Sequence, residues 1–173
     1  MSASETSIYV PQGKFEVSSS SSVFFSAVLG SCVAACLWDD DRHLGGMNHL
    51  LLPPDANVES GQGVHLMELL INALLKLGAE KSRLKVKLFG GSRMIDSLSD
   101  GGGRNAEFAR SFFAFEGIEV MAESLGGEHA RRIQFWPATG RARQRCVPND
   151  TVKPVKPPAP AAKPEAGGDI DLF

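Results

Sequence analysis

The pattern of apolar and polar residues predicts a β-hairpin early in the chain. Two apolar runs cover residues 33–38 and 47–52, and a polar stretch at residues 39–43 separates them. Short apolar runs bounded by turn residues are typical of strands. Because the strands of a hairpin run in opposite directions, the start of the first and the end of the second lie at the same end of the sheet.

Downstream, the pattern predicts two helices. Apolar residues recur at helical spacing over residues 64–77, and Gly78 is expected to end that helix. A second helix is predicted over residues 105–115. Three of its phenylalanines are expected to face the core, namely Phe108, Phe112 and Phe115. Phe113 lies off that stripe and is expected to be exposed for a partner.

Further strands complete a mixed α/β pattern. They are predicted at residues 84–89, 118–122, 133–136 and 141–147. The last two form a hairpin around the turn at residues 137–140. Strands that alternate with helices in this way indicate an α/β fold.

Composition indicates one soluble domain. The chain has 173 residues, a net charge of −2 and 43% hydrophobic residues, which is enough for one core. Basic residues are spread along the chain, so no nucleic-acid partner is expected. No apolar run is long enough to span a bilayer, so no membrane insertion is expected. Three cysteines without framework spacing favour a reducing, cytoplasmic location.

A change in composition at Pro148 marks the predicted end of the folded domain. Six of the ten prolines lie from this residue onward, which is typical of an extended linker. We therefore expect a flexible N-terminus at residues 1–13, a folded domain at residues 14–147 and a disordered tail at residues 148–173. The acidic and apolar ending at residues 169–173 is either a solvated end or a short docking peptide whose partner is unknown.

Cys32 and His49 are the candidate catalytic residues. Gly30-Ser31 forms a turn before Cys32, and turns at strand ends present reactive side chains to solvent. A nearby imidazole can take the thiol proton and so activate the nucleophile. We expect the pKa of Cys32 to be lowered, so that it alkylates faster than Cys36 and Cys146, which are expected to be structural. The alternative is that Cys32 is itself a buried structural cysteine.

Beyond this pair, a series of short motifs runs along the chain, and all but one of them contain glycine. In order they are Leu29-Gly30-Ser31-Cys32-Val33-Ala34, Gly45-Gly46-Met47-Asn48-His49, Leu51-Leu52-Pro53, Phe89-Gly90-Gly91-Ser92-Arg93-Met94, Gly103-Arg104-Asn105, Leu125-Gly126-Gly127 and Pro137-Ala138-Thr139-Gly140. Over residues 14–147 the series resembles the CheD family of bacterial chemoreceptor glutamine deamidases.

The resemblance implies a fold and a set of site residues. The fold is a single-domain layered α/β sandwich of mixed β-sheet with helices, similar to the cores of toxin deamidases. The site is a Cys-His-Thr constellation, in which Cys32 and His49 match and Ser26 stands in place of threonine. Ser26 keeps a hydroxyl that can hold the second nitrogen of the imidazole. Backbone N–H groups near Gly30 and Ser31 are expected to stabilise the oxyanion. A substrate or partner surface is expected at Gly90, Gly91, Ser92, Arg93 and Met94.

The resemblance also implies an activity and partners. The expected reaction converts receptor glutamines to glutamate in bacterial chemotaxis. Hydrolysis of receptor methyl esters is a second expected activity, because the ester presents the same acyl carbon to the nucleophile as the amide does. Expected partners are methyl-accepting chemotaxis receptors and a CheC-type phosphatase. Two alternatives stay open, namely an adaptor that acts mainly by binding and a small-molecule amidase. His43, His65 and His129 lack zinc-site spacing, and neither a metal nor a cofactor is expected.

Overall fold

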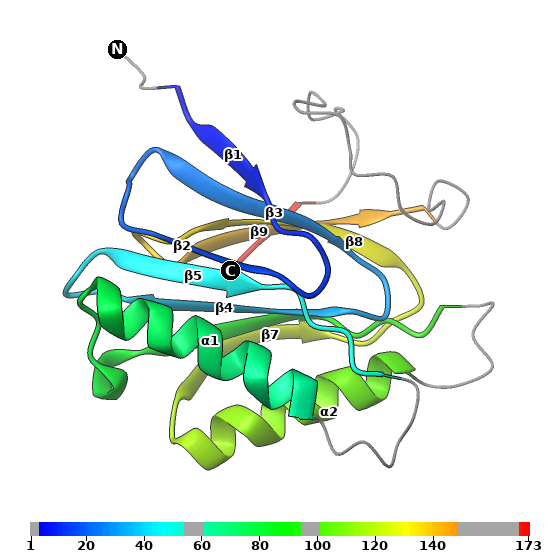
Figure 1. The fold of residues 1–173 in the computed structure, drawn as a ribbon. Coiled ribbons are helices and arrows are strands. Elements are labelled where there is room, and N and C mark those ends of the chain that lie inside the picture. The colour runs from blue at the N-terminus through cyan, green and yellow to red at the C-terminus, as the bar shows by residue number, and fades with distance from the viewer. Residues whose placement is uncertain (1–3, 54–60, 95–100, 149–169) are drawn as a thin grey trace.

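A computed structural model describes residues 4–53, 61–94, 101–148 and 170–173. Within these ranges the chain forms two five-stranded β-sheets packed face to face, and two α-helices cover the outer face of one sheet (Figure 1). The strands are β1 (Thr6–Tyr9), β2 (Phe15–Ser18), β3 (Val23–Leu29), β4 (Val33–Asp39), β5 (Leu44–Asn48), β6 (Lys85–Gly90), β7 (Glu119–Leu125), β8 (Ala130–Trp136), β9 (Arg141–Val147) and β10 (Ile170–Leu172). The helices are α1 (Gly61–Leu77), the short 3₁₀ helix η1 (Lys81–Arg83) and α2 (Gly101–Glu116).

The sheets are mixed and layered, which confirms the predicted α/β sandwich. The first sheet has the strand order β1-β3-β8-β9-β10, and the second has the order β2-β5-β4-β6-β7. The pairs β1–β3 and β6–β7 are parallel, and the other neighbouring strands are antiparallel. No helix in the described ranges has the length and apolar character needed to cross a membrane.

Strand β4 is buried on both faces. Val33, Ala35 and Leu37 pack against the helices. Ala34, Cys36 and Trp38 pack into the layer between the two sheets. A strand covered on both sides has no polar face, which explains its continuous apolar sequence. Cys36 is completely buried here, as expected for a structural cysteine.

Helix α2 buries Phe112 and packs Phe108 against the core as predicted, but it differs from the prediction at Phe113 and Phe115. Its buried stripe includes Ala106, Ala109 and Phe113, whereas Phe115 is 90% exposed. Positions three and four residues apart share a helix face, and Phe115 lies two residues beyond the buried Phe113. The prediction that Phe115 faces the core and that Phe113 lies off the stripe is therefore wrong. The small alanines mark the face that approaches the sheet closely.

Residues 6–13 are part of the fold, although residues 1–13 are predicted to be flexible. Strand β1 lies parallel to β3, with Tyr9 opposite Ser26. Val10 then donates its N–H to the carbonyl of Ser26 at 2.9 Å and is completely buried. Strands β1 and β2 are four residues long and mix polar with apolar residues, so their pattern is weak.

The end of the sequence also returns to the domain. Strand β10 pairs with β9, and the ring of Phe173 meets that of Phe89 edge-on, with 5.4 Å between their centroids. The backbone of Phe173 exchanges two hydrogen bonds with Ala142, at 3.0 and 3.1 Å. The last residue of the sequence therefore reaches the domain's own core. Residues 149–169 of the predicted disordered tail lie outside the described residues, and these include Asp169 of the predicted docking peptide.

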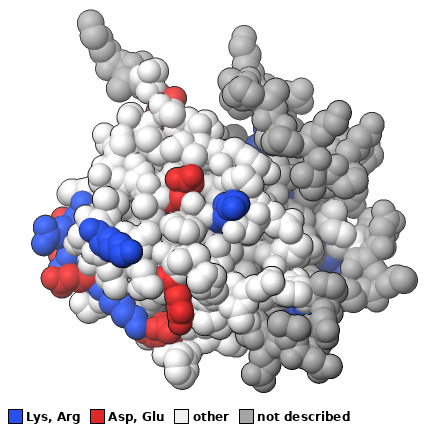
Figure 2. Space-filling model, in the orientation of Figure 1, with Lys and Arg blue, Asp and Glu red and all other residues white. Residues whose placement is uncertain are grey.

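Charged side chains gather at the end of the molecule that carries the β4–β5 turn. Arg83 pairs with the buried Asp39 at 3.1 Å, and Lys85 pairs with Asp40 at 2.9 Å. Figure 2 shows acidic and basic side chains gathered at the left edge of the face in view. The β3–β4 turn, which carries Cys32, lies at the opposite end (Figure 1).

Candidate active site

The strand register brings Cys32 and His49 to one face of the second sheet. Val33 faces Leu50 across an antiparallel bridge, and further along the same two segments Cys36 faces Met47. This register places His49 opposite Ala34. Cys32 precedes Ala34 by two residues and therefore shares its face. The two candidate side chains are thus diagonal neighbours across the strand pair, at a separation that side chains can bridge.

His49 is held by a backbone carbonyl. The residue is 4% exposed, and its Nδ1 lies 2.9 Å from the carbonyl oxygen of Val10. A carbonyl only accepts hydrogen bonds, so Nδ1 carries the proton and the neutral ring has its lone pair on Nε2. Burial lowers the pKa of His49 below its ordinary 6.5, although the Val10 carbonyl opposes that shift. The imidazole is therefore a neutral base at neutral pH.

The turn that carries Cys32 is fixed through three consecutive carbonyls. The carbonyl of Gly30 accepts a hydrogen bond from the Ser92 N–H at 2.9 Å, and that of Cys32 accepts one from the Gly91 N–H at 2.8 Å. The carbonyl of Ser31 accepts one from Asn105 Nδ2 at 2.8 Å. A turn with all three carbonyls engaged has little freedom to move, so the cysteine is presented in a defined position.

Close packing explains the glycine at position 90. Its φ is +108°, and a Cβ there would lie 2.1 Å from the carbonyl oxygen of Cys32. Only glycine fits such a contact and such a φ. Gly90, Gly91 and Ser92 are buried against the turn at residues 30–32, which we call the nucleophile turn. These three residues were expected to belong to a substrate or partner surface, but they support this turn from inside.

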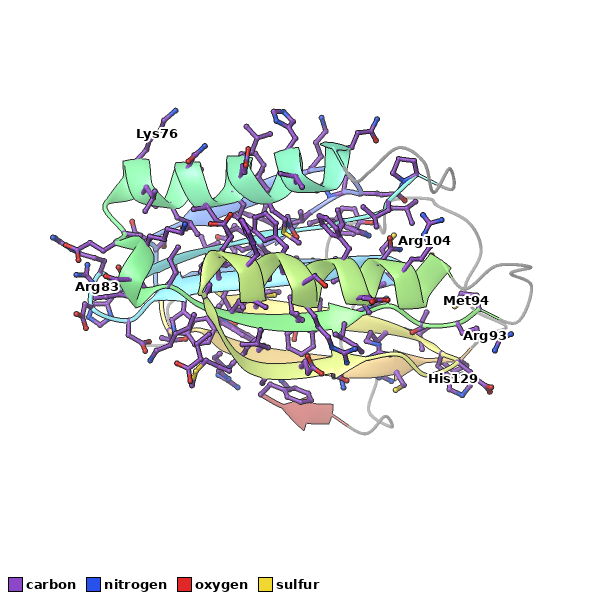
Figure 3. All side chains as sticks on the ribbon, turned by 90° about the horizontal axis from the view of Figure 1, so that it is seen from below. Lys76, Arg83, Arg93, Met94, Arg104 and His129 are labelled. Carbon is purple, nitrogen blue, oxygen red and sulfur yellow. The ribbon has the colours of Figure 1, made fainter. Side chains whose placement is uncertain are left out.

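The remainder of that motif lies at the surface. Arg93 is exposed and Met94 is half-buried, with the Met94 side chain against Gly30. Figure 3 shows Arg93, Met94 and His129 at one end of the molecule, while Lys76 and Arg83 lie at the other end. A surface role for Arg93 and Met94 stays a prediction.

Asn105 ties together the chain segments that carry the two candidate residues. It is 1% exposed. Its Oδ1 accepts a hydrogen bond from the N–H of Leu52 at 3.0 Å, while Nδ2 donates to the carbonyl of Ser31. Leu52 follows His49 closely, and Ser31 precedes Cys32. One buried amide therefore fixes both segments against α2.

A buried arginine supports the turn from the side of the first sheet. Arg131 on β8 donates to Ser92 Oγ at 3.1 Å and to Ser124 Oγ at 3.0 Å. Ser92 Oγ donates in turn to the carbonyl of His129 at 2.6 Å. This network links the Ser92 backbone, which holds Gly30, to the loop that precedes β8.

The Cys32 thiol is protonated in the free protein, contrary to the expectation of a lowered pKa. Burial raises the pKa of Cys32 to about 11, and its own backbone N–H only partly opposes that rise. The hydrogen bond of its sulfur, within the ranges that the structure describes, runs to Gln12 Oε1 at 3.9 Å. No hydrogen bond joins Cys32 to His49 in the same ranges. Cys146, expected to be structural, is exposed.

Ser26 makes other contacts than the one predicted for it. Its Oγ lies 3.5 Å from Ser7 Oγ, and the Nδ1 of His49 is already paired with Val10. The backbone of Ser26 instead anchors Val10 through its carbonyl. The sequence gives no sign of the role of Val10, because a backbone carbonyl leaves no signal in the residue type.

A thiol beside a neutral imidazole suits attack on an acyl carbon of an amide or an ester. Such an attack needs a sulfur nucleophile and an acceptor for its proton, and these are the groups that the Cys32 thiol and the Nε2 lone pair of His49 offer. Neither step needs a bound group from outside the chain.

Comparison with known proteins places the chain in a family. The family model described as CheD chemotactic sensory transduction matches residues 55–146. A protein of Agrobacterium fabrum (strain C58 / ATCC 33970) is 49% identical over 100% of this chain and 99% of its own length. A protein of Caulobacter sp. (strain K31) is 48% identical over 96% of this chain and 92% of its own, and one of Caulobacter vibrioides is 46% identical over the same shares. All three are named probable chemoreceptor glutamine deamidase CheD. With identity of this level over nearly the full length, the chain belongs to the CheD family.

Proposed function

We propose that this protein is a chemoreceptor glutamine deamidase in which Cys32 is the nucleophile and His49 the base. The observation that carries the proposal is the geometry of His49. Its Nδ1–H is fixed on Val10, so Nε2 carries the lone pair, and the strand register places the side chains of His49 and Cys32 on the same face of the sheet. The names of the full-length relatives support the substrate class.

The reaction begins from a neutral pair. The thiol proton moves to Nε2 of His49 as the sulfur forms a bond to the side-chain carbonyl carbon of a receptor glutamine. The tetrahedral intermediate collapses when the imidazolium gives its proton to the leaving nitrogen, and ammonia departs. His49 then takes a proton from water, which attacks the thioester. Glutamate leaves, and the proton on His49 returns to the sulfur.

Burial favours this order of events. It raises the pKa of Cys32 and lowers that of His49, so both groups resist charge in the free protein. A stable thiolate and imidazolium pair does not accumulate. Proton transfer is therefore coupled to bond formation with the substrate, which shields the thiol from other electrophiles.

The same site also suits methyl esters of receptor glutamates. Attack at the equivalent acyl carbon forms the same thioester, with methanol leaving in place of ammonia. Association with a CheC-type phosphatase is a further expectation of the family. A purified mixture of this protein and such a phosphatase, analysed by size-exclusion chromatography, tests that association directly.

The test of the proposed function is mass spectrometry of a cytoplasmic receptor fragment before and after incubation with the protein. Glutamine converted to glutamate gains about one mass unit, and a methyl ester that is hydrolysed loses about fourteen. Cys32→Ala is expected to abolish both changes, and His49→Ala to reduce them by orders of magnitude. Cys146→Ala removes an exposed thiol and is the matched control, with activity retained. Turnover by purified Cys32→Ala would contradict the proposal.

A further inference from the structure

A tight turn next to the site holds a glutamine in a defined position. The N–H of Lys14 bonds to the carbonyl of Pro11 at 3.0 Å, which closes a four-residue turn with Gln12 and Gly13 at its centre. Gly13 has a φ of +80°, the value that a type II turn requires at its third position. Glycine adopts this φ without strain, so the sequence favours this turn at this place.

The turn is attached to His49 itself. The N–H of Gly13 donates to the carbonyl of His49 at 2.8 Å, and the N–H of His49 donates to the carbonyl of Lys14 at 3.0 Å. Val10, which comes shortly before the turn, holds the imidazole. The backbone pairing that positions the base therefore also positions Gln12.

The side chain of Gln12 reaches the nucleophile. Its Oε1 lies 3.9 Å from Cys32 Sγ, within the distance at which a thiol donates a hydrogen bond. Gln12 is exposed and Cys32 is half-buried, so this contact lies where the site meets solvent. Resting on the proposed deamidase function, we propose that Gln12 is a catalytic residue whose carboxamide donates to the oxyanion of the tetrahedral intermediate.

The proposed role uses both polar atoms of the Gln12 carboxamide, the oxygen as an acceptor and the nitrogen as a donor. In the resting state the protonated thiol donates to Oε1. Once the thiol proton has moved to His49, the sulfur no longer has a proton to donate, and negative charge grows on the substrate oxygen. Rotation about the Cγ–Cδ bond exchanges Oε1 for the Nε2 amide, which offers two N–H donors. The oxyanion forms on the carbon bonded to Sγ, so a group that touches Sγ is within reach of it.

Gln12 acts only through hydrogen bonds in this scheme. The sulfur–carbon bond forms and breaks as in the proposed mechanism, the thiol proton travels through His49, and ammonia carries it away. The backbone N–H of Cys32, which acts on its own sulfur, is a second donor beside the oxyanion. A hydrogen-bond donor to the oxyanion is worth about 10²-fold to 10³-fold in kcat.

The alternative is that Gln12 is a substrate. A glutamine carboxamide held against the nucleophile of a glutamine deamidase could be attacked, which would convert Gln12 to glutamate and release ammonia. Catalytic and substrate roles differ in a measurable way, because only the second changes the mass of the protein.

The experiment compares Gln12→Ala, Gln12→Glu and wild type on a receptor fragment. Gln12→Ala is expected to lower kcat about a hundredfold with KM changed by less than about threefold. Gln12→Glu is expected to be slower still, because a carboxylate has no donor and repels the oxyanion. The control is Asn72→Ala, which removes an exposed carboxamide from α1. Asn72 lies one helical turn from Lys76, at the end of α1 far from Met94 (Figure 3), and this variant should match wild type.

A second readout does not depend on deamidation. The added charge of Gln12→Glu should slow the alkylation of Cys32 by iodoacetamide and leave that of Cys146 unchanged. An inactive wild type would contradict the proposed function, whereas an active wild type with an equally active Gln12→Ala would overturn the role of Gln12. A gain of about one mass unit at Gln12 in wild type, absent from Cys32→Ala, would overturn it in favour of self-deamidation.

Discussion

The alkylation rate of Cys32 tests the protonation state that the structure gives the site. Burial raises the pKa of the thiol from an ordinary 9.0 to about 11. A shift of this size lowers the thiolate fraction at neutral pH about a hundredfold, to roughly one molecule in ten thousand. Iodoacetamide reacts with the thiolate, so Cys32 is expected to label slowly at neutral pH despite its place in the site.

The assay varies pH and follows each cysteine by peptide mass spectrometry. Labelling of Cys32 should rise about tenfold per pH unit and level off near its pKa of about 11. The exposed Cys146 is the internal reference and should label faster at neutral pH. Cys36 is completely buried and should label only when the protein unfolds.

One result would refute this description of the site. If Cys32 labels fastest at neutral pH and its rate changes little as pH rises, the free protein holds a thiolate beside a charged imidazole. His49→Ala distinguishes the two cases further. Removing a neutral ring should leave the pH at which labelling levels off nearly unchanged, whereas removing an imidazolium should raise it.

Three further predictions concern the base, the buried amide and the last strand. Burial lowers the pKa of His49, so its neutral form persists below pH 6.5. As the pH is lowered, kcat/KM should therefore stay level down to pH 6.5 and fall only below it. A pH profile of kcat/KM with its midpoint above 6.5 would contradict this. Asn105→Asp keeps the acceptor for Leu52 but loses the donor to Ser31, so kcat should fall about tenfold to a hundredfold while circular dichroism shows a folded protein. Phe173→Ala removes the contact with Phe89 and should cost roughly 1–2 kcal/mol of unfolding free energy in a denaturant titration, with kcat unchanged. Stability equal to wild type would show that Phe173 does not contribute to the core.

The sequence pattern predicts those parts of the fold that are buried in a regular way. Strand β4 is apolar on both faces and α1 has a clear helical period, so both were expected at nearly their observed places. The places of Phe113 and Phe115 in α2 are predicted wrongly, because Phe112, Phe113 and Phe115 follow one another too closely for spacing alone to choose between them. Only the contact with the sheet selects Phe113.

The candidate site likewise contains some residues that the sequence predicts and others that it does not. Cys32 and His49 carry chemistry in their residue types, and the predicted hairpin brings them to one end of a sheet. The family, predicted from ordered motifs, is confirmed by the relatives. Val10 acts through its carbonyl and Asn105 through a buried amide far along the chain, and neither contact has a signature in spacing. A role for the Ser26 hydroxyl in orienting the imidazole stays a prediction, and the structure gives that nitrogen to Val10.

The support of the nucleophile turn has a consequence for the order in which the site is assembled during translation. The ribosome makes the chain from its N-terminus, so Cys32 and His49 are synthesised before the residues that hold the turn. The carbonyls of Gly30 and Ser31 receive their donors from Ser92 and Asn105, which emerge much later. A nascent chain that exposes only the hairpin therefore lacks the framework that fixes the thiol. The geometry that the proposed reaction needs is complete only after α2 has been synthesised.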